Sequence, residues 1–138
     1  MRTRAPGKQQ GVMLLEALIG ILIFSIGILA MLGMQAIGMR ATIDAKYRSE
    51  ASYLTNQIVG TMWVDRANIA SYDTVSGAGN NRRADWIARV QTTLPGSSGA
   101  NAPSIAVVGR QVTVTVRWQR VGEPTPSQHL AIAQINDS

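Results

Sequence analysis

The chain contains no cysteine and only one histidine, His129, and both scarcities limit its chemistry. Without cysteine it has no disulfide and no thiolate metal site. No glycine-rich phosphate loop follows a predicted strand, and the constellation of side chains that an enzyme needs is missing. We therefore expect no catalytic residues, no metal and no cofactor, and we interpret His129 as a surface residue of a strand.

Charge is almost absent from the first part of the chain. Glu16 is the only charged residue between Lys8 and Arg40, and from 17 to 34 the only side chain that is not apolar is Ser25. A run of this length predicts a membrane-spanning helix. A carboxylate costs up to roughly 3 kcal/mol at the centre of a bilayer helix and less near the interface, so Glu16 should have a cationic partner.

The residues before this run form a basic leader. Residues 1–11 contain Arg2, Arg4 and Lys8 and no acid. A secretory signal is cut after its apolar segment, whereas the plausible cut here, after Gly11, precedes it. Removing the leader leaves ten basic against eight acidic side chains, a balance of +2 instead of +5. The remaining basic residues are scattered, so we expect no nucleic-acid partner.

A long helix is predicted to continue beyond the apolar run. No proline lies between Pro6 and Pro95, and apolar residues recur at helical spacing as far as Ile69. A helix from Val12 to about Ile69 would be roughly 85 Å long, more than a ~30 Å hydrocarbon layer requires. The predicted apolar stripe comprises Ile43, Tyr47, Ala51, Leu54, Ile58, Met62 and Ile69.

Three glycines of this helix, Gly20, Gly27 and Gly38, fall on one face. Small residues let neighbouring helices approach closely in a membrane or a fibre core. Glycine is also simply common in membrane helices, and no pair here has the four-residue spacing of the best-known dimer motif. Both interpretations stay open.

The second half of the chain predicts a small domain. Residues 71–81 have a loop composition, and 84–94 carry apolar residues at helical offsets before Pro95 and Gly96. Alternation predicts strands at 104–108, 111–119 and about 128–135, the last with Leu130, Ile132 and Ile135, and a hairpin turn at Gly109 and Arg110. We expect an α+β fold, in which the second half of the long helix packs on a three-stranded antiparallel sheet with a short second helix.

Other residues that could suggest chemistry have simpler interpretations. Asp65, on a helix flank, and Asp73, in a loop, are expected to be solvated. The methionines of the apolar run are expected to pack in the membrane, and the tryptophans to serve as core or interface anchors rather than base-stacking platforms. These residues are Met31, Met34 and Met39, and Trp63, Trp86 and Trp118.

The start of the chain resembles a prepilin. The resemblance rests on Lys8, Gln9, Gln10 and Gly11, followed by Val12, Met13, Leu14, Leu15, Glu16 and the apolar helix. In that family a membrane peptidase cuts after the glycine and methylates the new amino terminus, which implies that Val12 is the first mature residue. The family also implies that Glu16 pairs with the α-amine of a neighbouring subunit, and a buried charge pair of this kind selects one axial register between helices.

The second half resembles the PilV-type minor pilins, also called type IV pilus modification proteins. The matching segments are Asp85 and Trp86, the 94–96 helix end and the strand from Val112 to Trp118; many relatives carry a cysteine pair that this chain lacks. The resemblance implies a leader at 1–11, a transmembrane and filament-core helix at 12–39, and an extracytoplasmic domain at 40–138 with its helix continuing over 40–69.

The expected role is that of a minor pilin that helps to initiate or cap pilus assembly and supports adhesion and twitching motility. Its expected partners are the prepilin peptidase, other minor pilins, the major pilin, the inner-membrane assembly platform, a tip adhesin and inner-membrane lipid. The expected location is the inner membrane, with the carboxyl terminus in the periplasm, and then the pilus at the cell surface.

Two alternatives share part of this pattern. A minor pseudopilin of a type II secretion system would have the same leader, Glu16 and helix. A single-pass anchored binding domain would never be cleaved and would keep residues 1–11.

Overall fold

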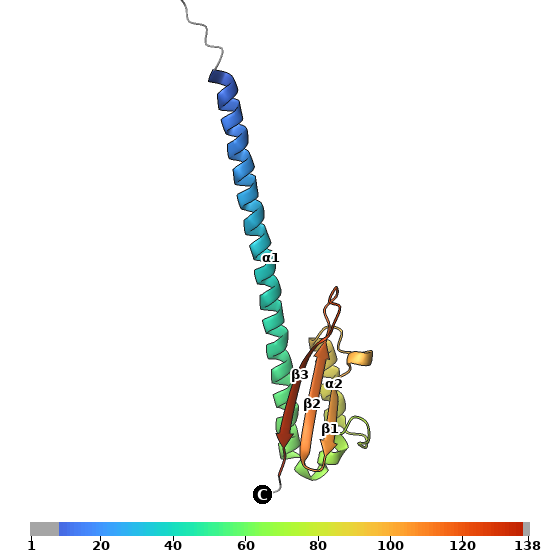
Figure 1. Cartoon of the computed structure of the whole chain (residues 1–138). Helices are drawn as coiled ribbons and strands as arrows, with labels where there is room; N and C mark the ends of the chain where they lie inside the picture. Colours follow the sequence, from blue (N-terminus) through green and yellow to red (C-terminus); the bar gives the residue numbers. More distant parts are fainter. Residues whose placement is uncertain (1–8, 137–138) are drawn as a thin grey trace, which may run out of the picture. The chain divides into compact units, whose positions relative to one another are not determined.

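The structure is a computed structural model that describes residues 9–136 and has an α+β fold, as predicted (Figure 1). The chain divides into two compact units, Met1–Ile43 and Asp44–Ser138, and helix α1 contributes to both. The elements in chain order are α1 (Gln9–Val64), the 3-10 helix η1 (Arg66–Tyr72), α2 (Asn81–Thr93), the 3-10 helix η2 (Gly99–Asn101), β1 (Ser104–Val108), β2 (Gln111–Trp118) and β3 (Ser127–Gln134).

Helix α1 ends at Val64, five residues before the predicted end at Ile69. The next residue, Asp65, has non-helical backbone angles, and its backbone carbonyl accepts a hydrogen bond from the N–H of Asn68 at 2.9 Å. The carboxylate accepts hydrogen bonds from the side-chain amide of Asn68 at 2.8 Å and from the hydroxyl of Tyr72 at 2.9 Å. The sequence pattern extended the predicted helix to Ile69 because Ile69, in η1, packs against the same core as the apolar stripe of α1.

Helix α2 begins three residues before the predicted start at residue 84. The reason is the N-cap Asn80, whose side-chain oxygen accepts a hydrogen bond from the backbone N–H of Arg83 at 3.0 Å. The helix gives way to an extended residue, Leu94, directly before Pro95, which confirms the predicted end.

The three strands form an antiparallel meander in the order β1-β2-β3, as predicted. The turn between β1 and β2 contains Gly109 with a φ of +60°, a conformation that favours glycine. The predicted strand boundaries agree with the observed ones within one residue.

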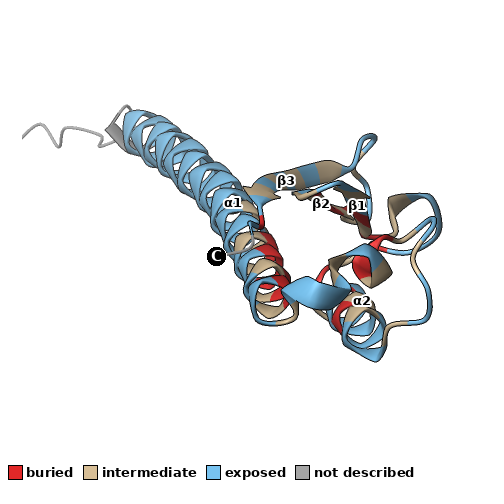
Figure 2. Ribbon diagram, turned by 90° about the horizontal axis from the view of Figure 1, so that it is seen from below, coloured by how far each residue is buried: buried red, intermediate tan, exposed pale blue. Residues whose placement is uncertain are grey.

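The core of the second unit lies between the sheet and the two helices, and the buried residues in Figure 2 gather on their facing sides. The predicted stripe on α1 is confirmed from Ala51 onward, because Ala51, Leu54, Ile58 and Met62 are all buried. Tyr47 and Ile69 are partly buried against this core, whereas Ile43 is exposed. The other core residues are Tyr72, Trp86, Val90, Leu94, Ile105, Val112, Val114, Val116, Trp118 and Ile135.

Strand β3 departs from the expected pattern. Ile135, just after the strand, is buried, but Leu130 and Ile132 are 49% and 61% exposed. They pair with Thr115 and Thr113 of β2, on the face of the sheet opposite to the buried valines. The core side of β3 instead carries small or polar residues, namely Ser127, His129, Ala131 and Ala133.

Residues 73–80 form no helix or strand, as the loop composition predicted, but the start of the 71–81 segment is anchored to the domain. Tyr72 is fully buried, and the segment that follows lies along the outer edge of β1. The backbone N–H of Thr74 donates to the carbonyl of Ile105 at 2.9 Å, and the backbone N–H of Val107 donates to the carboxylate of Asp73 at 2.9 Å. We call this arrangement the β1 clasp.

Candidate functional site

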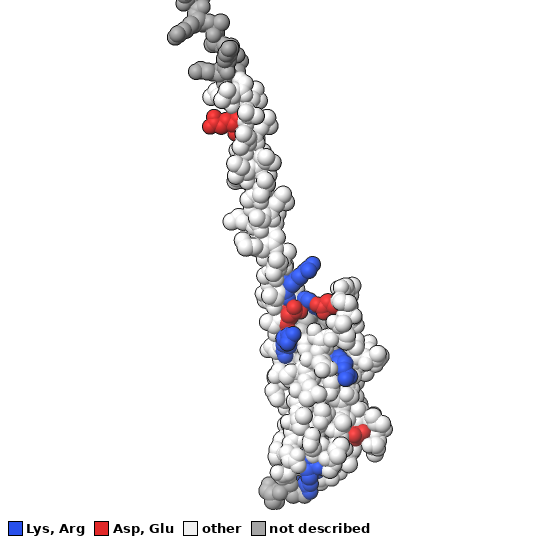
Figure 3. Space-filling model, in the orientation of Figure 1, with Lys and Arg blue, Asp and Glu red and all other residues white. Residues whose placement is uncertain are grey.

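The first unit presents an apolar helical surface. Every residue of α1 from Gly11 to Ile43 is exposed, and most of these residues are large and hydrophobic. Between Gly11 and Met39 the helix has no Lys or Arg, and this part is white in Figure 3 apart from one acidic patch. By length and composition, α1 is long and apolar enough to cross a membrane. Exposing so much apolar surface to water is unfavourable, so such a surface is stabilised by lipid or by contact with other helices.

Glu16 lies in the described part of this apolar surface and is exposed there. Gly11 and Val12 lie two turns or less before it within α1, which already begins at Gln9. A helix places residues 12 and 16 one above the other on the same face. Residues 1–8 of the leader, including Lys8, lie outside the described residues. Cleavage after Gly11, methylation of Val12 and the register role of Glu16 stay predictions.

The three glycines of the predicted packing face are unobstructed. A Cβ atom added at Gly20, Gly27 or Gly38 would meet nothing within 4 Å. The Thr42 hydroxyl donates to the carbonyl of Gly38 at 3.0 Å, so this polar side chain is satisfied within its own helix. Whether another helix approaches this face stays a prediction.

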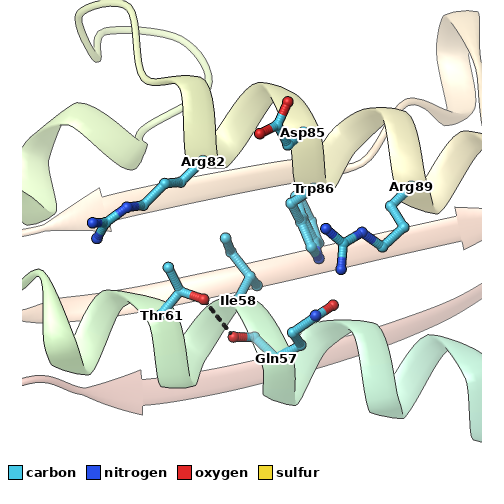
Figure 4. A pocket seen from close by; sticks show the side chains of 7 residues that line it. All are labelled: Gln57, Ile58, Thr61, Arg82, Asp85, Trp86 and Arg89. Atoms are coloured by element: carbon cyan, nitrogen blue, oxygen red, sulfur yellow. Dashed lines mark hydrogen bonds between the residues drawn. The ribbon is translucent and has the colours of Figure 1, made fainter.

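The second unit has a groove of about 170 Å³ between α1 and α2. In Figure 4, Ile58 and Trp86 lie between the helices, while Arg82 and Arg89 extend along the groove on either side of them. The Trp86 ring is fixed by a hydrogen bond from its Nε1 to the carbonyl of Leu54 at 2.8 Å. The groove holds the exposed guanidinium groups of Arg82 and Arg89 beside the buried Trp86.

The two aspartates that we expected to be solvated are both engaged, so this expectation is wrong. Asp65 bonds to Asn68 and Tyr72 and pairs with Arg82 at 3.2 Å. The Asn68 amide, followed by the Tyr72 hydroxyl, lowers the pKa of the Asp65 carboxyl, while burial is the main cause that raises the pKa of Tyr72.

Asp73 is only 9% exposed and is the centre of the β1 clasp. Its Oδ1 accepts hydrogen bonds from the backbone N–H groups of Val75 and Ser76 at 2.8 and 2.7 Å, while Oδ2 accepts from Val107. These backbone donors, led by that of Ser76, hold the pKa of Asp73 far below its ordinary value of 3.8. The carboxylate therefore has a structural role.

The predictions for the tryptophans and for His129 agree with the structure only in part. Trp86 and Trp118 are core residues, whereas Trp63 is 43% exposed on the surface of α1. His129 is half-buried on the core side of β3 rather than on its outer side. Within residues 9–136, no group of three or more His, Asp or Glu side chains is placed to hold a metal ion.

Sequence reasoning missed the structural roles of Tyr72, Asp73 and Asn80, which all lie in the segment with a loop composition. Asn80 offered a signal, because Asn is a preferred N-cap. Asp73 did too, since an aspartate that precedes Val75 and Ser76 can bond to their N–H groups as an Asx turn. Its bond to Val107, 34 residues away, had no local signal.

A comparison with protein-family models, curated proteins and solved structures finds no match for the chain. The α+β layout and the apolar helix of α1 are therefore the findings on which a function can be built.

Proposed function

We propose that the chain is a minor type IV pilin, a structural subunit anchored by α1 in the inner membrane and then built into a filament. The observation that carries the proposal is the position of Glu16. It is the only charged side chain between Lys8 and Arg40, five residues after Gly11, on a chain whose second unit is a small α+β domain.

The mechanism is assembly. Cleavage after Gly11 would create an α-amine at Val12, and the Glu16 carboxylate of a neighbouring subunit is its natural partner in an apolar environment. Such a pair selects one axial offset between helices, while the apolar side chains exchange lipid for helix contacts. The second unit then presents the surfaces that meet other minor pilins, the major pilin or a tip adhesin.

The test is intact-mass and amino-terminal analysis of the chain extracted from membranes of cells with and without prepilin peptidase. We expect a methylated Val12 as the first residue only where the peptidase is present. An uncut chain in both strains would instead support the anchored binding domain and refute the proposal.

A minor pseudopilin would pass the same test. Sheared pili and type II secretion complexes, purified from the same cells, separate the two functions. We expect the cleaved chain to copurify with the pili. Recovery with the secretion complex alone would replace the pilin by the pseudopilin.

A further inference from the structure

The two edges of the sheet differ. The outer edge of β1 is closed by the β1 clasp, through hydrogen bonds that involve Asp73 and Thr74. Strand β3 (Ser127–Gln134) forms the opposite edge, and within the described residues its only neighbouring strand is β2. An open edge presents backbone donors and acceptors that can pair with another chain.

The register identifies the residues whose backbone groups face outward. The N–H of Ile135 donates to the carbonyl of Arg110, its direct partner when the β2–β3 register is extended by one residue. Hydrogen-bonded and non-hydrogen-bonded pairs alternate in an antiparallel ladder. Ala131 and Ala133 therefore bond to β2, whereas the N–H and C=O groups of Leu130 and Ile132 point to the open edge.

This edge lacks the usual protection against pairing. Natural edge strands carry charged residues, proline or bulges that discourage another strand. The eight residues of β3 include no Lys, Arg, Asp, Glu or Pro. The same residues that offer their backbone to the edge, Leu130 and Ile132, also place exposed apolar side chains on the outer face.

The inverted pattern of β3 is a separate observation. A shift of one residue would bury Leu130 and Ile132 and expose alanines, and hydrophobic burial normally selects that register. The strand keeps its large apolar side chains outside, over Thr115 and Thr113. A strand that covers them would account for this arrangement.

We propose that β3 is a docking edge that accepts an extended segment of a different polypeptide chain as a fourth strand. The segment pairs its backbone with Leu130 and Ile132 and places apolar side chains beside theirs on the outer face. Fully paired along β3, it would have about eight residues and a length of roughly 26 Å. The open edge is a property of β3 and does not depend on the chain being a pilin, whereas the choice of a different chain over a second copy rests on the membrane anchor of the proposed function.

A second copy is not the chosen occupant. Within the second unit, β3 and the Asp44–Val64 part of α1 run in the same direction (Figure 1). Antiparallel pairing of two β3 strands would set those two helical segments in opposite directions, whereas copies held in one membrane by the same helix share its direction.

The experiment uses the full chain in detergent micelles and a synthetic peptide of alternating valine and threonine with a lysine at each end. Amide hydrogen exchange is followed residue by residue. Adding the peptide should slow exchange of Leu130 and Ile132 at least about tenfold and leave Ala131 and Ala133, already bonded to β2, nearly unchanged. A peptide with proline at its centre should have no effect.

Two variants separate the edge from the apolar face. Ile132→Pro removes an outward N–H without removing a bond to β2, so it should keep the fold and abolish the peptide effect. Ile132→Thr keeps that N–H and should retain weaker binding. Unchanged exchange at Leu130 and Ile132 in the folded parent chain, or equal protection in Ile132→Pro, would overturn the proposal.

The second-copy alternative has its own test. The chain has no cysteine, so Ile132→Cys introduces the sole thiol. We expect this variant to stay monomeric under oxidation in membranes. Efficient disulfide-linked dimers of Ile132→Cys, but not of the control variant Gln119→Cys, would show that β3 pairs with the β3 of a second copy. This result would overturn the choice of a different chain.

Discussion

At the scale of single residues, two buried polar side chains differ in how well they are satisfied. Asp73 is surrounded by backbone donors, whereas the hydroxyl of the fully buried Thr55 has no hydrogen-bond partner among the described residues. A satisfied buried group stabilises the fold and an unsatisfied one opposes it. The two residues therefore give opposite predictions.

Asp73 should make the second unit sensitive to acid. Its pKa is lowered in the folded chain, so its contribution to stability is fully present above the ordinary aspartate value of 3.8 and is lost as the pH falls below that value towards the folded-state pKa. Asp73→Asn should lower the melting temperature at neutral pH and flatten its fall between about pH 4 and 2. Thermal unfolding of the full chain measures this.

The control is Asp85→Asn, at an exposed carboxylate of α2. This variant should have nearly the same melting temperature as the parent chain at neutral pH. If Asp73→Asn also followed the parent chain, the β1 clasp would contribute nothing to stability.

Thr55→Val should stabilise the second unit. Valine has nearly the same shape and removes a buried hydroxyl that has no partner within residues 9–136. We expect a gain of about 1 kcal/mol in the free energy of unfolding. Denaturant unfolding of the full chain provides the measurement. Thr61→Val, which removes a hydroxyl bonded to the Gln57 carbonyl at 2.9 Å, should give no such gain.

At the scale of elements, sequence reasoning succeeded where a pattern is local and periodic. The stripe from Ala51 to Met62 predicted the buried face of α1, and the alternation from Val112 to Trp118 predicted β2. Sequence reasoning failed where contacts with residues far away in the chain determine the structure. β3 contains apolar residues in alternation, but the pairing with β2, rather than the pattern, determines that Leu130 and Ile132 face outward.

The ends of helices show the same limit. Pro95 stops α2 by its own geometry, so that end was predictable. Helix α1 ends at Val64, and Tyr72 turns back to bond with the next residue, Asp65; a 3.6-residue period gives no sign of that turn. Glu16 stands out in the sequence because an isolated charge in an apolar run is a local signal. The roles of Gly11, Val12 and Glu16 stay predictions.

Asn80→Ala should destabilise α2 by about 1 kcal/mol, because it removes the cap on the N–H of Arg83. The loss should appear as faster amide exchange in the first turn of α2 and as a lower unfolding free energy. Asn80→Asp should retain most of the stability, since aspartate also caps helices. The matched Asn81→Ala, at the exposed first residue of the helix, should change stability little. An equal loss in both variants would contradict the capping role.

At the scale of the whole molecule, the chain combines two units that need different environments. Met1–Ile43 exposes apolar side chains along its described helix, while Asp44–Ser138 buries a core between helices and sheet. The second unit buries apolar side chains in its own core, whereas the apolar side chains of the first can be buried only in lipid or against other helices. Under the proposed function, Glu16 is the one side chain that makes the change from lipid to helices specific.

Glu16→Gln tests this role directly, because it keeps the size of the side chain and removes its charge. Loss of one member of a buried charge pair costs about 3–5 kcal/mol, so the share of the chain in sheared filaments should fall at least about tenfold. Leader removal and the amount in the membrane should stay near the parent level, as measured by amino-terminal sequencing and immunoblotting. Glu50→Gln, at an acidic residue of α1 in the second unit, should enter filaments normally. If Glu16→Gln also entered normally, helix packing alone would select the register, and the carboxylate would have no part in assembly.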